Sequence, residues 1–199
     1  MPTSPKERIL NLAARQIVRP RDLDDRGLPR SMLASMVETG ELIRTGRGTY
    51  ISPDLELSEH HALAEVSKRI PHAAICLLSA LQFHELTLDL PRATWIAVKR
   101  GSRIPNPHDL KLRVYQFSEP AFSHGLETHK IEGVSVRITT PAKTIADCFK
   151  FRRDVGTTAA YQALKQAWEN DAVTADALVA AAKVCRVYRL MRPYLDTLS

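Results

Sequence analysis

Closely spaced helix starts and stops in residues 4–40 restrict the fold of this chain more than any other feature. Ser4-Pro5-Lys6-Glu7 is a capping box, in which the serine and glutamate side chains accept from free amides and proline takes the first helical position. A second, short helix suits residues 21–25 and closes near Gly27. Pro29 begins a third helix, which Gly40 ends. Three short helices joined by tight turns are therefore expected before residue 41.

A short ribbon follows the third predicted helix. Residues 42–44 and 49–51 suit two strands, and Thr45-Gly46-Arg47-Gly48 between them suits a turn with a basic tip. Short helices followed by such a ribbon are the elements of a winged helix-turn-helix. Residues 1–53 are therefore expected to form a winged helix-turn-helix DNA-binding domain.

The third predicted helix has two chemically different faces. Leu33, Met36 and Val37 have the spacing of a buried stripe. The other side carries small or polar side chains and one arginine: Arg30, Ser31, Ala34 and Ser35. A helix that enters the major groove needs such a face, because bulky side chains would hold its backbone away from the bases.

The predicted DNA-binding residues come from this helix and from the ribbon. Arg30, Ser31 and Ser35 would face the groove, while Arg44 and Arg47 would reach phosphate or the minor groove. The alternative is a module of the same fold that binds protein or only packs. The basic charge, the small helix face and the basic ribbon together favour double-stranded DNA.

The remainder, residues 57–199, is expected to form a mixed α/β domain after a linker at residues 53–56. Its predicted strands make a small mixed sheet with a hairpin turn at Glu132-Gly133: residues 94–98, 112–117, 128–131 and 134–138. Its predicted helices precede and follow that sheet: residues 58–69, 74–85, 142–150, 157–169, 174–185 and 187–198. The predicted class is therefore α+β, with a helical C-terminal tail.

Composition favours a polyanionic partner and a reducing compartment. The 199 residues are 44% hydrophobic and carry a net charge of +6, with a pI of about 9.4. Lys and Arg exceed Asp and Glu in residues 1–53 and 143–199 and balance them in between, which favours a polyanion.

Cys76, Cys148 and Cys185 are widely spaced, so buried free thiols are expected. Without a membrane-spanning apolar run or a signal-peptide core, the protein is expected to be soluble and cytoplasmic.

Three segments resemble the AbiEi family of antitoxins and transcriptional regulators. They are GELIRTGRGTY at residues 40–50, LSALQFHELT at 78–87 and VRITTPAKTIADC at 136–148, in the order that the family has them. The family often has glycine where Glu85 stands and an acidic residue where Ala142 stands. The resemblance implies a repressor that binds inverted repeats in the promoter of its own toxin–antitoxin operon, of type IV.

The same resemblance implies a second partner. It is a nucleotidyltransferase-like toxin, which the second domain counteracts, classically without a stable toxin–antitoxin complex. Residue chemistry alone gives no sign of that partner.

No metal or cofactor site is expected. His60 and His61 are adjacent, and adjacent residues diverge on a helix, so one ion could not easily take both. The ligand spacings of structural metal sites are absent from the sequence, as are the phosphate-binding P-loop and the dinucleotide fingerprint.

No catalytic residue is expected either. His84 lies in an apolar segment and is expected to be a core or interface histidine that bonds to the backbone. Lys143 and Asp147 are expected to pair at i,i+4 after a Thr140-Pro141 cap, with phosphate binding by Lys143 as the alternative.

Two functions from different classes remain open at this point. The first is a DNA-binding antitoxin and transcriptional autorepressor that is not an enzyme. The second is a nucleic-acid-processing enzyme, a nuclease or transferase, that a winged helix only delivers to its substrate. Such an enzyme gathers carboxylates around metal ions, whereas the acidic residues of 54–142 are scattered along the sequence, which favours the first function.

Overall fold

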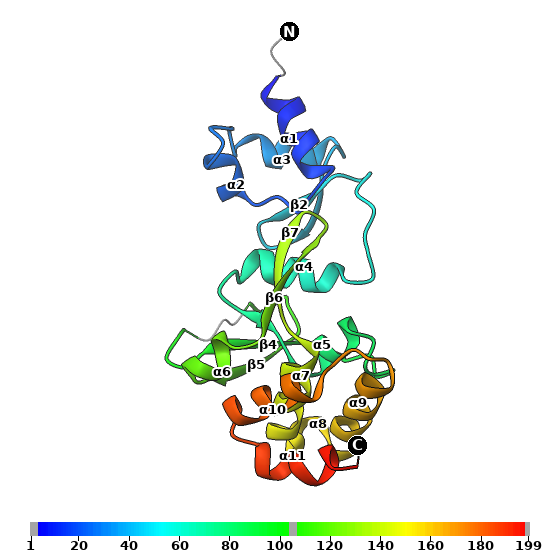
Figure 1. Ribbon diagram of the computed structural model, residues 1–199. Coiled ribbons are helices and arrows are strands. Elements are labelled where there is room, and N and C mark those ends of the chain that lie inside the picture. Colours follow the sequence, from blue (N-terminus) through cyan, green and yellow to red (C-terminus); the bar gives the residue numbers. More distant parts are fainter. Residues whose placement is uncertain (1–3, 104–106, 198–199) are drawn as a thin grey trace. The chain divides into compact units, whose positions relative to one another are not determined.

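The structure is a computed structural model that describes residues 4–103 and 107–197 (Figure 1). Its contacts divide the chain into two compact units. The N-terminal unit comprises the chain up to Arg69 together with Lys130–Ser135, and the C-terminal unit comprises Ile70–His129 and the chain from Val136 onward. This boundary follows residue 69, later in the chain than the predicted linker at residues 53–56.

Short helices and a small ribbon make up the N-terminal unit. Its elements in chain order are α1 (Pro5–Ala13), α2 (Pro20–Asp24), α3 (Met32–Glu38), β1 (Ile43–Gly46), β2 (Thr49–Ile51) and α4 (His61–Arg69). The predicted capping box is confirmed, because Ser4 N donates to Glu7 Oε2 at 2.8 Å and Glu7 N donates to Ser4 Oγ at 3.2 Å. The predicted ribbon is present as the antiparallel pair β1–β2. Strand β1 continues to Gly46, so the turn is only Arg47-Gly48 and not the predicted residues 45–48.

One apolar core joins these helices to the ribbon. Its buried members are Ile9, Ala13, Val18, Leu23, Leu28, Leu33, Met36 and Leu42. Val18 is also paired with the ribbon: its amide donates to Tyr50 O at 2.8 Å, and Tyr50 N donates to Val18 O at 2.9 Å. The segment between α1 and α2 therefore lies beside β2 and fixes the ribbon to the helices.

The third helix begins later than predicted. Pro29 does not start it; instead Met32 N and Leu33 N donate to the carbonyls of Pro29 and Arg30, at 3.2 Å each, in i,i+3 turns. The α-helix begins only at Met32. Arg30 and Ser31, predicted on the helix, therefore lie in the turn before it, since a 3₁₀-type turn often precedes a helix and the sequence signals of the two are alike.

The tip of a hairpin completes the N-terminal unit. The helix predicted from Ser58 begins at His61, and Ser58 instead donates from N and Oγ to Glu132 Oε1 at 2.8 and 2.9 Å. His61 Nδ1 lies 2.7 Å from Glu132 Oε2. The predicted turn Glu132-Gly133 is confirmed, with φ values of 48° and 72°. The Glu132-Gly133 turn is thus held by residues around the start of α4.

A small mixed sheet and a set of helices make up the C-terminal unit (Figure 1). Its elements are β3 (Ala74–Ile75), α5 (Leu77–Phe83), β4 (Thr94–Lys99), β5 (Leu112–Phe117), α6 (Glu119–Ser123), β6 (Leu126–Ile131), β7 (Val134–Thr139), α7 (Pro141–Lys150), α8 (Arg152–Val155), α9 (Thr157–Glu169), α10 (Ala175–Val184) and α11 (Tyr188–Leu195). The strand order is β5-β4-β3-β7-β6; β3 is antiparallel to β4 and parallel to β7, and β4 is parallel to β5. The predicted mixed α+β class is therefore confirmed, and so is the helical tail. The last helix ends at Leu195, earlier than the predicted end at residue 198, which lies outside the described residues.

Helix α7 lies at the centre of the C-terminal unit. Every residue from Ala142 to Phe149 is buried, and α7 contacts α5, α8, α9, α10 and α11. A helix buried on all sides is normally apolar throughout. The polar residues inside it therefore need partners within the core.

One predicted helix is wrong in part. Of the predicted segment 74–85, residues Ala74 and Ile75 form the central strand β3, paired with Ala97 and Ile96 of β4, and only Leu77–Phe83 is helical. An apolar run this short suits a buried strand or a buried helix equally well, and partners distant in the sequence decide between them.

Glu85 stands where the AbiEi family often has glycine. Its φ is 58°, in the left-handed region that favours glycine. The backbone therefore keeps the conformation that a glycine there would adopt without strain.

Candidate nucleic-acid interface

The predicted DNA-facing side of α3 is exposed, and its opposite side is buried. Leu33 and Met36 are each 2% exposed and Val37 packs partly buried against the same core, which confirms the predicted stripe. Ala34 and Ser35 are exposed. Ser35 Oγ donates to Met32 O at 3.0 Å, and its oxygen can still accept a hydrogen bond from a ligand.

Arg30 and Ser31 are presented by the turn that leads into α3. Arg30 is exposed, and its Nη1 lies 3.6 Å from Asp24 Oδ2 at the end of α2. An exposed pair of this kind adds little to stability, so the guanidinium can exchange the carboxylate for a phosphate or a base edge at small cost. Ser31 is exposed, and its side chain makes no capping hydrogen bond to α3.

Arg44 and Arg47 are carried by the ribbon. Both are exposed: Arg44 lies on β1, where its Nε donates to Gly46 O at 3.2 Å, and Arg47 lies in the tip turn. A Cβ on Gly46 would lie 2.7 Å from Glu65 Oε1, so a side chain of α4 comes close to the ribbon here. The N-terminal unit therefore carries all the predicted DNA-binding residues on its surface.

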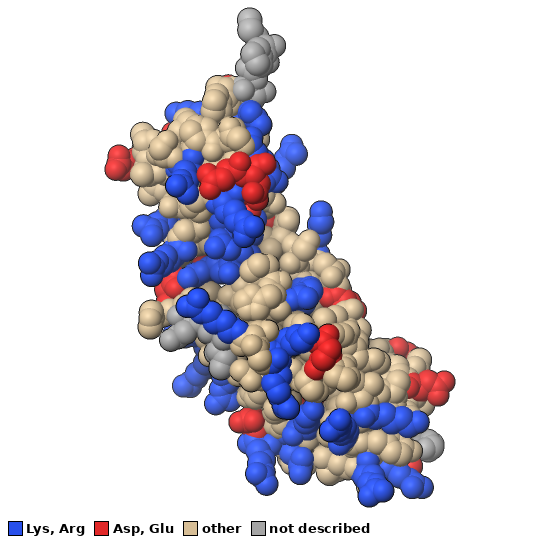
Figure 2. Space-filling view, turned by 90° about the vertical axis from the view of Figure 1, so that its left-hand side faces the viewer, with Lys and Arg blue, Asp and Glu red and all other residues tan. Residues whose placement is uncertain are grey.

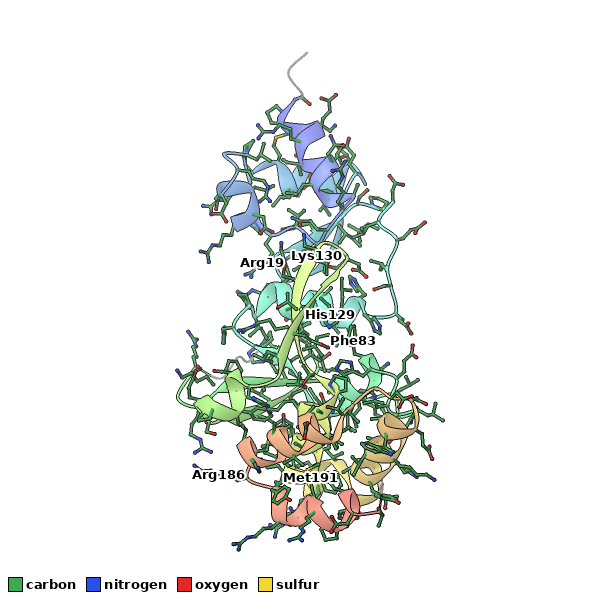
Figure 3. The ribbon with its side chains drawn as sticks, in the orientation of Figure 1. Arg19, Phe83, His129, Lys130, Arg186 and Met191 are labelled. Carbon is green, nitrogen blue, oxygen red and sulfur yellow. The ribbon has the colours of Figure 1, made fainter. Side chains whose placement is uncertain are left out.

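Contacts between residues distant in sequence hold this surface in place. Lys68 Nζ lies 2.9 Å from Asp22 Oδ2. Arg19 Nη1 donates to Lys68 O at 2.8 Å (Figure 3). These bonds join α4 to α2. The sequence did not predict these bonds, because no local pattern marks partners so far apart in the chain. It did not predict the Arg30–Asp24 pair either, because that pair depends on how α2 and α3 are placed.

A further ion pair joins the start of α1 to the segment after α3. Lys6 Nζ lies 2.6 Å from Glu41 Oε1. The hydrogen bond from Lys6, helped by one from Thr39, lowers the pKa of the Glu41 carboxyl. Positive charge nevertheless dominates the face shown in Figure 2, where Lys and Arg side chains outnumber acidic ones.

The buried pair in α7 is structural. Lys143 and Asp147 pair at i,i+4 as predicted, but their side chains are 0% and 1% exposed, and Cys185 Sγ donates to Asp147 Oδ1 at 3.2 Å. Burial raises the pKa of Asp147 and raises that of Cys185 to about 12. Because Lys143 has no access to solvent, its alternative role in binding phosphate has no support.

The N-terminal boundary of α7 differs in one detail from the prediction. Thr140 occupies the cap position and Pro141 the first turn, but the Thr140 side chain makes no capping hydrogen bond. The helix start is fixed instead by the buried Thr144, whose Oγ1 donates to Thr139 O at 3.0 Å.

His84 is bonded to the backbone, as predicted. Its Nε2 lies 2.7 Å from Thr139 O, and burial lowers its pKa. Phe83 packs against His129 with ring centroids 4.7 Å apart (Figure 3). All three cysteines are buried free thiols, which confirms that prediction too.

The described residues contain neither a metal-binding cluster nor a helix that could span a membrane. No group of three or more His, Cys, Asp or Glu side chains in residues 4–103 and 107–197 is arranged to hold a metal ion. Within the same ranges no helix has the length and apolar character needed to cross a membrane.

The N-terminal segment matches a known family. Residues 7–53 match the family model described as "Transcriptional regulator, AbiEi antitoxin". The resemblance is therefore confirmed over α1 to β2, and this segment carries the signature of AbiEi antitoxin transcriptional regulators. The match does not extend to residues 78–87 or 136–148, where the resemblance stays a prediction.

A solved structure shares the fold. The crystal structure of the RV2827C protein from Mycobacterium tuberculosis is similar with a TM-score of 0.51 and 13% sequence identity, over 98% of this chain and 81% of that one. At that identity the likeness shows the fold alone. No curated protein matches this chain.

Proposed function

We propose that this protein is a DNA-binding antitoxin and the transcriptional autorepressor of a toxin–antitoxin operon. The observation that carries the proposal is the AbiEi match over residues 7–53, because the matched segment contains the small-faced helix α3 and the basic ribbon. The proposed target is double-stranded DNA with inverted repeats in the operon's own promoter.

In this proposal the N-terminal unit is a winged helix-turn-helix. Helix α3 enters the major groove, with Ser31, Ser35 and Arg30 at the bases or the adjoining phosphates. Arg44 and Arg47 of the ribbon contact phosphate or the minor groove. Support comes from their exposure, and from the absence of bulky side chains at the exposed positions Ala34 and Ser35.

The second proposed partner is a nucleotidyltransferase-like toxin. The C-terminal unit, from Ile70 onward, is the proposed antitoxin part, since a DNA reader alone does not require a second unit with its own sheet and core. Direct contact with the toxin is not part of the proposal.

We also propose that the chain is not an enzyme. A metal-dependent nuclease or transferase needs paired carboxylates that reach its substrate. Asp147 is enclosed in the core and bonded to Lys143 and Cys185. The description of the matched family as a transcriptional regulator points the same way.

A mobility-shift titration tests the proposed function. Purified full-length protein is titrated into labelled DNA from upstream of its own operon, with a shuffled duplex of equal length and composition as control. We expect the upstream DNA to bind at least about 1,000-fold more tightly, the lower end of the usual ratio for specific over non-specific sites. Equal affinity for both duplexes would rule out site-specific repression.

A further inference from the structure

A pocket in the C-terminal unit has a strongly basic lining. It has a volume of about 590 Å³ and is open to solvent, and it is formed by α8, the end of α10 and the start of α11. The lining includes four cations: Arg152, Lys183, Arg186 and Arg189. No acidic side chain among the described residues lines it.

The positive charges of the pocket are not neutralised within the unit. Throughout residues 4–103 and 107–197, no carboxylate lies within ion-pair distance of any of the four cations. Nearby Arg192, by contrast, pairs with Asp196 at 3.7 Å. Like charges gathered in one place repel one another, so an anion with several charges would relieve that repulsion.

Local contacts position two of these cations. Arg152 Nη1 donates to Phe149 O at 3.3 Å, and Lys183 Nζ lies 5.8 Å from the centre of the Tyr188 ring. Side chains already held in position lose less freedom on binding a ligand.

Arg186 stands where the backbone favours glycine. Its φ is 60°, and the closing bonds of α10 surround it: Arg186 N donates to Lys183 O at 3.0 Å, and Val187 N donates to Ala182 O at 2.8 Å. Glycine is the usual residue at such a helix end. Figure 3 shows Arg186 at the outer side of these helices and the buried Met191 among them. The fold therefore does not require this arginine.

We propose that this pocket binds the polyphosphate group of a nucleotide. Guanidinium groups donate two parallel hydrogen bonds to phosphate oxygens, and lysine adds a point charge, so the lining suits several linked phosphates. The pocket volume lies in the range of sites for small ligands. A concave site of this size fits a compact polyanion better than the continuous backbone of a duplex.

Calorimetric titration of the full-length protein tests the proposal. Pyrophosphate, ATP and adenosine are titrated separately in low-salt buffer that contains EDTA and no phosphate or sulfate. We expect pyrophosphate and ATP to bind at one site per chain and adenosine not to bind. If pyrophosphate fails to bind, or if adenosine binds as well as ATP, the polyphosphate site is refuted.

The variant Arg186→Gly distinguishes a loss of pyrophosphate binding from a loss of folding stability. Glycine removes a cation and also relieves the left-handed strain, so we expect unchanged or higher thermal stability together with roughly tenfold weaker pyrophosphate binding. Arg189→Gln is a second variant with the same expected loss. Lys165→Gln, on α9 and paired with Glu169 at 3.6 Å, is the matched control and should bind as the parent does.

Binding of duplex DNA by the same variant tests whether the pocket is instead part of a nucleic-acid surface. If Arg186→Gly weakens binding of upstream DNA while pyrophosphate binding is absent or unchanged, the pocket belongs to a nucleic-acid surface and the proposal is wrong. The proposal does not depend on operator binding, because a protein that bound no DNA could still bind pyrophosphate here.

Discussion

Arg30 and Arg47 are alike in chemistry but are expected to differ in what they contact. Arg30 adjoins the helix proposed to enter the groove, whereas Arg47 lies in the tip turn of the ribbon. Arg30→Ala should cost about 1–3 kcal/mol of binding to upstream DNA and relax its preference over shuffled DNA. Arg47→Ala should weaken both duplexes evenly and reduce the salt slope by about 1.

Fluorescence anisotropy at several salt concentrations measures both effects. Lys165→Gln removes one exposed charge from α9 and serves as the control for net charge. Upstream and shuffled affinities that stay at the parent values in both arginine variants would contradict the assignment of this surface.

At the same scale, substitution of Asp147 tests how much the buried ion pair contributes to stability. Asp147→Ala leaves the buried Lys143 amino group without its carboxylate partner and leaves Cys185 Sγ without its acceptor. We expect a loss of about 3–5 kcal/mol of unfolding free energy, measured in urea. The double variant Lys143→Met/Asp147→Leu should recover most of that loss, because apolar residues of similar volume often replace a buried pair without cost.

The exposed pair Lys165–Glu169 gives the matched comparison. It has the same i,i+4 spacing, with side chains 56% and 60% exposed. Glu169→Ala should change stability by at most about 0.5 kcal/mol. A similar loss in Asp147→Ala and Glu169→Ala would show that burial does not set the energy of these pairs.

At the scale of elements, the hairpin tip at Gly133 lies in close contact with Arg15 and Gln16 of the same unit. A Cβ on Gly133 would lie 2.6 Å from both Arg15 O and Gln16 Cβ, and the φ of Gly133 is 72°. Gly133→Ala should therefore add a steric clash of about 1–3 kcal/mol to the strain of a left-handed alanine. Thermal unfolding measures the difference.

Gly27 supplies the control for strain alone. Its φ is 63°, and nothing lies within 4 Å of an added Cβ. Gly27→Ala should cost only about 1–2 kcal/mol. If Gly133→Ala is no more destabilising than Gly27→Ala, the tip does not depend on this contact.

The elements that local signals define could be predicted from the sequence. The capping box at Ser4, the ribbon around Gly48, the helix over residues 157–169 and the exposed side of α3 all follow from patterns a few residues long. These patterns work because caps, turns and helix faces involve neighbours in the chain.

The elements that the sequence did not reveal depend on distant partners. Ala74 and Ile75 are strand residues because β4 and β7 lie on either side of them. Ser58 bonds Glu132 instead of capping a helix. In the candidate interface, the exposure of Arg30 was predictable, but its pairing with Asp24 depends on how α2 and α3 are placed.

At the scale of the whole molecule, repression and antitoxin activity should separate. The full-length double variant Arg30→Ala/Arg47→Ala alters only exposed residues of the N-terminal unit, so the core of the C-terminal unit stays intact. We expect loss of promoter repression in a reporter assay and retained protection of cells that express the neighbouring toxin. Loss of protection at equal protein abundance would show that the two activities share one surface.

Sequence-specific operator binding is the central claim, and a hydroxyl-radical footprint on the upstream DNA tests it most directly. Helix α3 of each bound molecule would enter one major groove, and inverted half-sites would be occupied by separate copies. We predict two protected stretches that coincide with an inverted repeat, both lost in the Arg30→Ala/Arg47→Ala variant. Uniform protection along the fragment, or an unchanged footprint in that variant, would contradict the account.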